Sequence, residues 1–117
     1  MRNKNIILVG AKSGEKLALD SMEPIAICYL SSYLMKAGFK TRVIHQKPHE
    51  SNKEISNRII KEKPFIVGFS TYASNYHNSL SIAKMCKKKI KTKTIFGGYH
   101  ASKYPKLLLT AKGGWIP

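Results

Sequence analysis

A regular alternation of short apolar runs with segments of helical periodicity constrains the fold of this chain most. The apolar runs are uninterrupted, which is typical of strands buried on both faces. We expect strands at residues 5–9, 41–45, 65–70 and 94–96. We expect a helix that begins at Glu23–Pro24 and ends in a left-handed cap at Gly38, and a second helix that begins with a capping box formed by Ser51 and Glu54. A third expected helix covers 78–90, and a last short one includes 105–110. Short links between such elements predict a parallel sheet with helices on both faces and right-handed crossovers.

The C-terminal segment does not continue this pattern. Residues 111–117 fit no further strand and helix, so the predicted fold is α/β, a flavodoxin-like doubly wound parallel sheet with four strands and a missing fifth. The fourth strand would then be an uncovered edge. We therefore expect residues 1–117 to form a single domain that is incomplete at its C-terminus, or one whose open edge is covered by a partner or by self-association.

The formal net charge is +15, from 21 Lys and Arg against 6 Asp and Glu, which suggests nucleic-acid binding. The lysines are distributed along every expected helix, however, and only 84–93 forms a dense run. Cations there would meet the carbonyl end of a helix dipole, and no aromatic side chains interleave with them as stacking platforms. We therefore do not expect nucleic acid as the partner, and retain a basic nucleic-acid-binding protein as an alternative.

Hydrophobic residues make up 43% of the chain, but no apolar stretch approaches the roughly 18 residues that a membrane-spanning helix needs. The apolar stretch near Met1 is too short for a signal peptide. We expect a cytoplasmic protein that does not enter a membrane. The two cysteines, Cys28 and Cys86, lie on expected helices among apolar neighbours and are predicted to be buried thiols.

Two strand ends carry the candidate binding residues. One apolar run closes in Gly68-Phe69-Ser70-Thr71-Tyr72, and another closes in Gly97-Gly98-Tyr99-His100. In an open α/β sheet, ligands bind outside the carboxyl ends of the strands. Two such ends, with small residues and accessible backbone, predict a shared floor for a large, flat ligand.

Other chemistries find less support in the sequence. The glycine spacing in residues 10–16 matches neither a P-loop nor a dinucleotide-binding fingerprint. No paired carboxylates or Ser-His-Asp order accompany the strand ends, so no catalytic residue is assigned. His45 and His49 flank a strand end rather than sharing a helix face, so no metal site is predicted. His77 and His100 follow the third and fourth strands, where either both meet one ligand or His100 bonds local backbone.

Four segments, taken in order, carry a resemblance to a known family. Residues 23–39 read EPIAICYLSSYLMKAGF, 63–70 read KPFIVGFS, 75–80 read NYHNSL and 96–101 read FGGYHA. They resemble the family patterns PLGLAYLASYLKKAGH, KPDIVGFS, NYPNAL and FGGPHA. The chain thus resembles the N-terminal cobalamin-binding domain of cobalamin-dependent radical S-adenosylmethionine enzymes, over nearly all of residues 5–109.

The resemblance implies that cobalamin is the cofactor and that its nucleotide tail enters between strand ends and helix starts. Hydroxyls at the third strand end would bond the tail, glycines at the fourth would admit backbone to close range, and helix N-termini would favour the phosphate. The implied cofactor-binding residues are Ser70, Thr71, Tyr72, Gly97, Gly98 and His100.

Two departures from related proteins limit what the chain does alone. The D-x-H-x-x-G motif, whose histidine ligates cobalt in methionine synthase-type domains, is absent, so no protein-derived cobalt ligand is implied. The C-x-x-x-C-x-x-C motif of the radical barrel is also absent, and two isolated cysteines cannot hold an iron–sulfur cluster. We therefore hypothesise a module that binds cobalamin without catalysing a reaction, whose partner would be a radical S-adenosylmethionine domain. The alternative is a degenerate module that has lost cofactor binding and serves as a structural or interaction protein.

Overall fold

The computed structural model describes residues 4–13, 25–71, 74–97 and 114–115. The elements are β1 (Asn5–Gly10), α1 (Ile25–Lys36), β2 (Lys40–His45), α2 (Asn52–Glu62), β3 (Ile66–Ser70), α3 (Tyr76–Lys89), β4 (Lys93–Gly97) and β5 (Gly114–Trp115). All strands are parallel and form one sheet in the order β2-β1-β3-β4-β5. The predicted α/β, flavodoxin-like doubly wound fold is confirmed.

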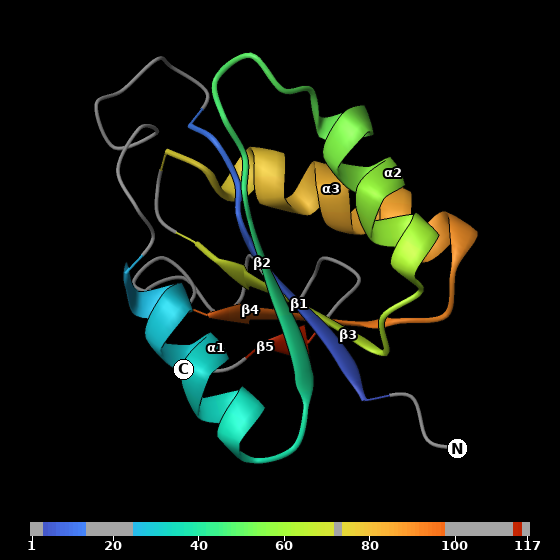
Figure 1. Ribbon diagram of the computed structural model, residues 1–117. Coiled ribbons are helices and arrows are strands. Elements are labelled where there is room, and N and C mark those ends of the chain that lie inside the picture. Colours follow the sequence, from blue (N-terminus) through green and yellow to red (C-terminus); the bar gives the residue numbers. More distant parts are fainter. Residues whose placement is uncertain (1–3, 14–24, 72–73, 98–113, 116–117) are drawn as a thin grey trace.

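Helices cover both faces of the sheet, as predicted. Figure 1 shows α1 on one face and α2 and α3 side by side on the other. Strand β1 lies between β2 and β3, and every residue from Ile6 to Gly10 is buried. This double covering explains why its sequence is a continuous apolar run rather than an alternating one.

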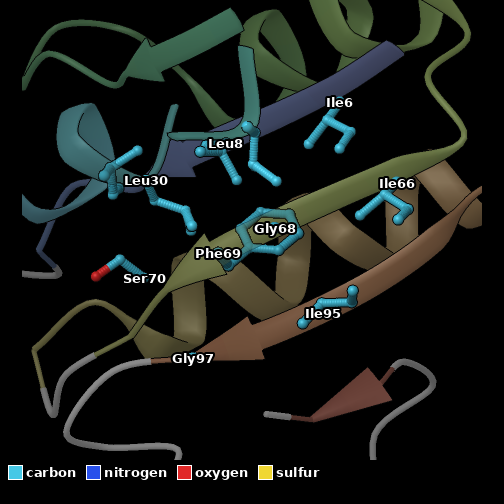
Figure 2. Close-up of a pocket in the computed structure, with 11 residues that line it drawn as sticks. Ile6, Leu8, Leu30, Ile66, Gly68, Phe69, Ser70, Ile95 and Gly97 are labelled. Atoms are coloured by element: carbon cyan, nitrogen blue, oxygen red, sulfur yellow. The ribbon is translucent and has the colours of Figure 1, made fainter. Parts of the chain in front are cut away.

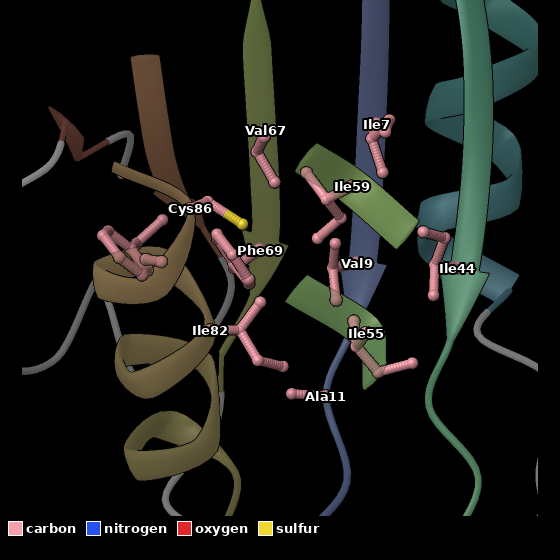
Figure 3. Packing of buried hydrophobic residues seen from close by; sticks show 12 residues of the cluster. Ile7, Val9, Ala11, Ile44, Ile55, Ile59, Val67, Phe69, Ile82 and Cys86 are labelled. Carbon is pink, nitrogen blue, oxygen red and sulfur yellow. The ribbon is translucent and has the colours of Figure 1, made fainter. Parts of the chain in front are cut away.

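The larger hydrophobic core lies between the sheet and the α2–α3 pair. Side chains of alternate strand residues meet apolar residues of both helices there (Figure 3). The rings of Phe69 and Phe96 stack in this core with centroids 5.3 Å apart. A smaller cluster under α1 contains Ile6, Leu8 and Ile27. Each fully buried aliphatic side chain contributes about 1.5–3 kcal/mol, so the α2–α3 side dominates the stability of the fold.

The predicted start of α2 at Ser51 and the predicted end of α1 at Gly38 are confirmed, whereas the start predicted at Glu23–Pro24 lies outside the described residues. The Ser51 hydroxyl accepts a hydrogen bond from the Glu54 amide at 3.1 Å, and the Glu54 carboxylate accepts one from the Ser51 amide at 3.4 Å. Lys63 ends α2 in the left-handed conformation with φ of 48°. Gly38 follows α1 with φ of 96°, a conformation that glycine adopts without a steric penalty. Local sequence thus sets these boundaries.

The expectation that the fifth strand is missing is wrong. Gly114 and Trp115 form a two-residue strand, β5, that pairs in parallel with Ile95 and Phe96 of β4. So short a strand has no hydrophobic period to detect, and Gly113-Gly114 reads locally as a loop. Strand β4 is therefore not an open edge at these two positions. The helix predicted to include 105–110 lies outside the described residues.

The two cysteines occupy different environments. Cys86 is fully buried between α3 and the sheet, as predicted, but Cys28 is exposed, so the prediction for that residue is wrong. Helix α1 has apolar residues around much of its circumference, and Tyr29 and Tyr33 are also exposed. Apolar neighbours in the sequence therefore do not identify which residues of α1 are buried. Burial raises the pKa of the Cys86 thiol to about 11, partly offset by its hydrogen bond with Ser56.

Replacing Ser51 by alanine should lower the free energy of unfolding by about 1 kcal/mol, because the cap of α2 loses its acceptor. Urea denaturation followed by circular dichroism measures this change. Asn57→Ala, at an exposed position of the same helix, is the matched control and should change the stability by less than about 0.5 kcal/mol. Equal effects of the two substitutions would contradict the capping role.

Thiol labelling at pH 8 should modify Cys28 rapidly and leave Cys86 unmodified in the folded protein, because the thiolate is the reactive species and Cys86 is both buried and protonated. Mass spectrometry after a maleimide pulse measures the two rates. A Cys28→Ser variant should take up label only after denaturation. Labelling of that variant at the rate of the wild-type protein would show that Cys86 is accessible.

Candidate cofactor-binding site

The two strand ends singled out in the sequence lie side by side at the carboxyl edge of the sheet. Ser70 at the end of β3 is in register with Gly97 at the end of β4. The carbonyl of Gly97 accepts two hydrogen bonds from Thr71, one from the amide at 2.7 Å and one from the hydroxyl at 2.9 Å. The carboxyl ends of β3 and β4, which the two motifs predict to lie together, are therefore joined directly by hydrogen bonds.

The predicted binding residues have different surroundings. Ser70 is half-buried at the edge of a pocket, whereas Thr71 is buried and its hydroxyl is engaged by the Gly97 carbonyl. His77 lies in the first turn of α3, exposed, with its ring 4.1 Å from that of Tyr76. Tyr72, Gly98 and His100 lie outside the described residues, so their predicted roles remain predictions.

An apolar pocket with a volume of about 380 Å³ lies between α1 and the sheet (Figure 2). Pockets of roughly 300–1,000 Å³ are typical of small-molecule and cofactor sites. Ser70 and Gly97, at the strand ends described above, line one edge of the pocket. The remaining walls are formed by Ile6, Leu8, Ile27, Leu30, Leu34, Ile66, Gly68, Phe69 and Ile95.

Among the described residues, α1 covers only part of its face of the sheet, and the pocket lies beside it. Helix α1 packs on β1 and β2, while on β3 and β4 the residues facing α1, such as Ile66 and Ile95, stay half-buried. Gly68 forms the middle of the floor, and a Cβ there would approach Leu8 Cδ2 to 2.9 Å. The absent side chain therefore lets Leu8 lie across β3 and keeps the floor flat.

Asn75 connects the loops that follow β1 and β3. This residue is fully buried, and its side-chain amide donates to the carbonyl of Ala11 at 3.1 Å and to the carbonyl of Ser70 at 3.0 Å. Nearby, the hydroxyls of Ser13 and Ser74 lie within 3.2 Å of each other. The position of Ser70 at the pocket is thus tied to the loop after β1.

Further amides extend this network to the loop after β2. The Asn78 amide donates to the Lys12 carbonyl at 2.7 Å, and the Asn52 amide donates to Asn78 Oδ1 at 3.0 Å. Gln46, fully buried, donates to Asn52 Oδ1 at 3.0 Å and accepts from the Lys12 amide at 2.9 Å. The ends of three strands are therefore joined by side-chain amides rather than by charges.

Sequence reasoning did not assign Asn75, Asn78, Asn52 or Gln46 to the site. A signal was present, because each is an uncharged amide placed just after a strand end or in the first turn of the helix that follows. Amides both donate and accept, so they can satisfy backbone groups where loops converge. Which loop each one bonds depends on the packing of distant segments.

Two other kinds of feature are absent from the described residues. Within them, no three His, Cys, Asp or Glu side chains gather in a way that could hold a metal ion. Nor does any helix among the described elements have the length and apolar character needed to span a membrane.

A flavodoxin-like sheet with an apolar pocket that reaches its carboxyl edge is typical of α/β domains that bind ligands. The family model of the B12 binding domain matches residues 17–116, and the chain therefore belongs to this family. A comparison with curated proteins found no match. Family membership supports cobalamin as the ligand.

Replacing Asn75 by alanine should lower the free energy of unfolding by about 1–3 kcal/mol, because two buried carbonyls lose their donor. Hydrogen exchange measured by mass spectrometry should rise in residues 10–13 and 70–75. Hydrogen exchange in the part of α2 that follows its first turn should change little in comparison. Unchanged exchange at both loops would contradict the bridging role.

Proposed function

We propose that this chain binds cobalamin and places the nucleotide tail of the cofactor in the pocket between α1 and β3–β4. The observation that carries the proposal is the extent of this pocket, whose lining reaches Ser70 and Gly97 at the strand ends in a member of the B12-binding family. These are two of the residues that the sequence resemblance implies for the cofactor. We further propose that residues 1–117 act as one binding module.

The chemistry of the pocket suits the end of such a tail. A flat aromatic base gains free energy by leaving water for an apolar slot, about 25 cal/mol for each Å² of apolar surface buried. Gly68 provides a floor without a side chain, and Leu30 and Leu34 of α1 provide the facing wall. The Ser70 hydroxyl, at the pocket edge, is suited to bond a polar group of the tail.

The amide network would keep this pocket open before the cofactor arrives. Asn75 and Asn78 hold the first loop against α3, so Ser70 is positioned in the protein alone. Binding then costs less ordering of loops, and that preorganisation favours affinity.

We propose that the chain holds the cofactor and does not catalyse a reaction on its own. Bound cobalamin would supply the cobalt–carbon chemistry of methyl transfer or of a related radical reaction. The resemblance to radical S-adenosylmethionine enzymes supports a domain of that class as the partner. Because β5 already pairs with Ile95 and Phe96 of β4, we do not propose self-association of the sheet edge at these two residues.

Titration of the purified protein with hydroxocobalamin tests the proposal. We expect a change in the visible spectrum of the cofactor and its co-elution with the protein in gel filtration. Gly68→Val should weaken binding about tenfold or more, because the new side chain enters the pocket and displaces Leu8. Its thermal unfolding should stay close to that of the wild-type protein, since Leu8 can move into the open pocket.

Gly38→Asn is the matched control, because it also replaces a glycine but adds its side chain where no atom lies within 4 Å. Asparagine tolerates the positive φ at that position, and cobalamin affinity should be unchanged. An unchanged spectrum with no co-elution would sink the proposal of cobalamin binding. Equal weakening by both variants would instead reject this pocket as the site.

A further inference from the structure

The fold gathers exposed lysines at the edge of the sheet where the strands begin. The Lys40 amide bonds the Lys4 carbonyl at 3.1 Å, which places the starts of β2 and β1 side by side. The Lys93 amide bonds the Phe65 carbonyl at 2.9 Å, which adds the start of β4 beside β3. Lys4, Lys40 and Lys93 are all exposed, as are Lys63 and Lys91 just before β3 and β4.

The ends of the three helices add to the same edge. In a parallel sheet with helical crossovers, each helix ends where the next strand begins, and Figure 1 shows α2 and α3 ending on the side where β3 and β4 start. The last turns contain Lys36 in α1, Lys61 in α2, and Lys87, Lys88 and Lys89 in α3. We call this surface of strand starts and helix ends the basic pole.

Little negative charge offsets the basic pole. Each helix C-terminus contributes about half a negative charge, far less than the lysines around it. Among the described residues, the acid at this edge is Glu62, and it is engaged by Arg42 at 3.0 Å. Glu50 and Glu54 lie at the opposite edge, near the start of α2.

We infer that the basic pole binds the phosphate backbone of a nucleic acid. The edge from β2 to β4 covers three strand spacings, about 14 Å, over which one strand of duplex DNA presents about four phosphates. The lysines are scattered along the sequence, and it is the parallel topology that concentrates them. The lysines of this surface do not line the pocket under α1, and the inference does not depend on cobalamin binding.

The residue types favour nucleic acid over two other anionic partners. Protein interfaces are enriched in arginine and depleted in lysine, whereas the pole consists of lysines around an arginine already paired with Glu62. Membrane-binding surfaces combine basic with inserted apolar residues. Within the described part of the chain, the large exposed apolar residues all lie on α1, where Tyr33 and Met35 are in the last turn, and none lies at the strand starts or on α2 and α3. Lysines without fixed geometry suit contacts that do not read sequence.

Fluorescence anisotropy with labelled 20-nucleotide single strands and 20-base-pair duplexes tests the inference. Affinity should fall steeply with salt, with little dependence on base sequence. The triple variant Lys40→Gln/Lys91→Gln/Lys93→Gln should reduce the slope of log K against log salt by about 2–3, since each lost phosphate contact removes about 0.9. Preferential binding of either probe supports the inference and identifies the form of nucleic acid bound.

The matched control is Lys47→Gln/Lys53→Gln/Lys84→Gln, which removes the same charge from exposed positions outside the pole, two of them at the opposite edge and Lys84 one turn before the end of α3. It should change the slope by less than 1. Equal effects of the two triples would overturn the inference, because net charge alone would then explain binding. Undetectable binding at low salt would also overturn it. The inference would also be overturned if polyglutamate competed for the protein as well as nucleic acid does, because that result would identify an acidic protein as the partner. Tighter binding to phosphatidylserine vesicles than to nucleic acid would overturn it as well, because that result would identify a membrane.

Discussion

The arrangement of the carboxyl edge of the sheet depends on the hydrogen bonds that one buried side chain makes, that of Asn75. Its amide holds the carbonyls of Ala11 and Ser70 at once, and these belong to loops 59 positions apart in a sequence whose β1 and β3 are neighbours in the sheet. An uncharged amide suits this position, because burial of a carboxylate there would require a counter-charge. Ser70, the pocket edge and the start of α3 are all placed by this one residue.

The pocket follows from an imbalance between the two faces of the sheet. Helices α2 and α3 cover β1, β3 and β4 with a dense core that includes Phe69 and Phe96. Helix α1 covers β1 and β2, and the residues of β3 and β4 on its side of the sheet stay half-buried. In the described part of the chain, one face therefore supplies most of the buried apolar core, and the other retains partly exposed apolar surface. Gly68 strengthens this division, because it keeps the second face free of a side chain.

The sequence predicts features that depend on neighbours along the chain and misses those that depend on distant partners. The apolar run of β1, the capping pair Ser51 and Glu54, and the glycine after α1 were all readable. The pairing of Gly114 and Trp115 was not, because the edge of β4 decides it. The exposure of Cys28, the amide network and the gathering of lysines at one edge likewise require the folded topology. Ser70 and Gly97 were expected to lie together because the carboxyl ends of parallel strands meet at one edge of the sheet, and the register of β3 and β4 confirms this placement, while their role in binding stays a prediction.

The burial of β1 on both faces has a consequence for how the sheet aligns. Ile6 and Leu8 face α1 while Ile7 and Val9 face the larger core, so both sets are apolar. A slip of β1 by one residue would exchange two similar sets, and the hydrophobic pattern alone discriminates weakly against it. The polar contacts that follow the strand do discriminate, because such a slip would carry Ala11 and Lys12 away from Asn75, Asn78 and Gln46. The side-chain amides of Asn75, Asn78 and Gln46 thus also help to set the register of β1 in the sheet.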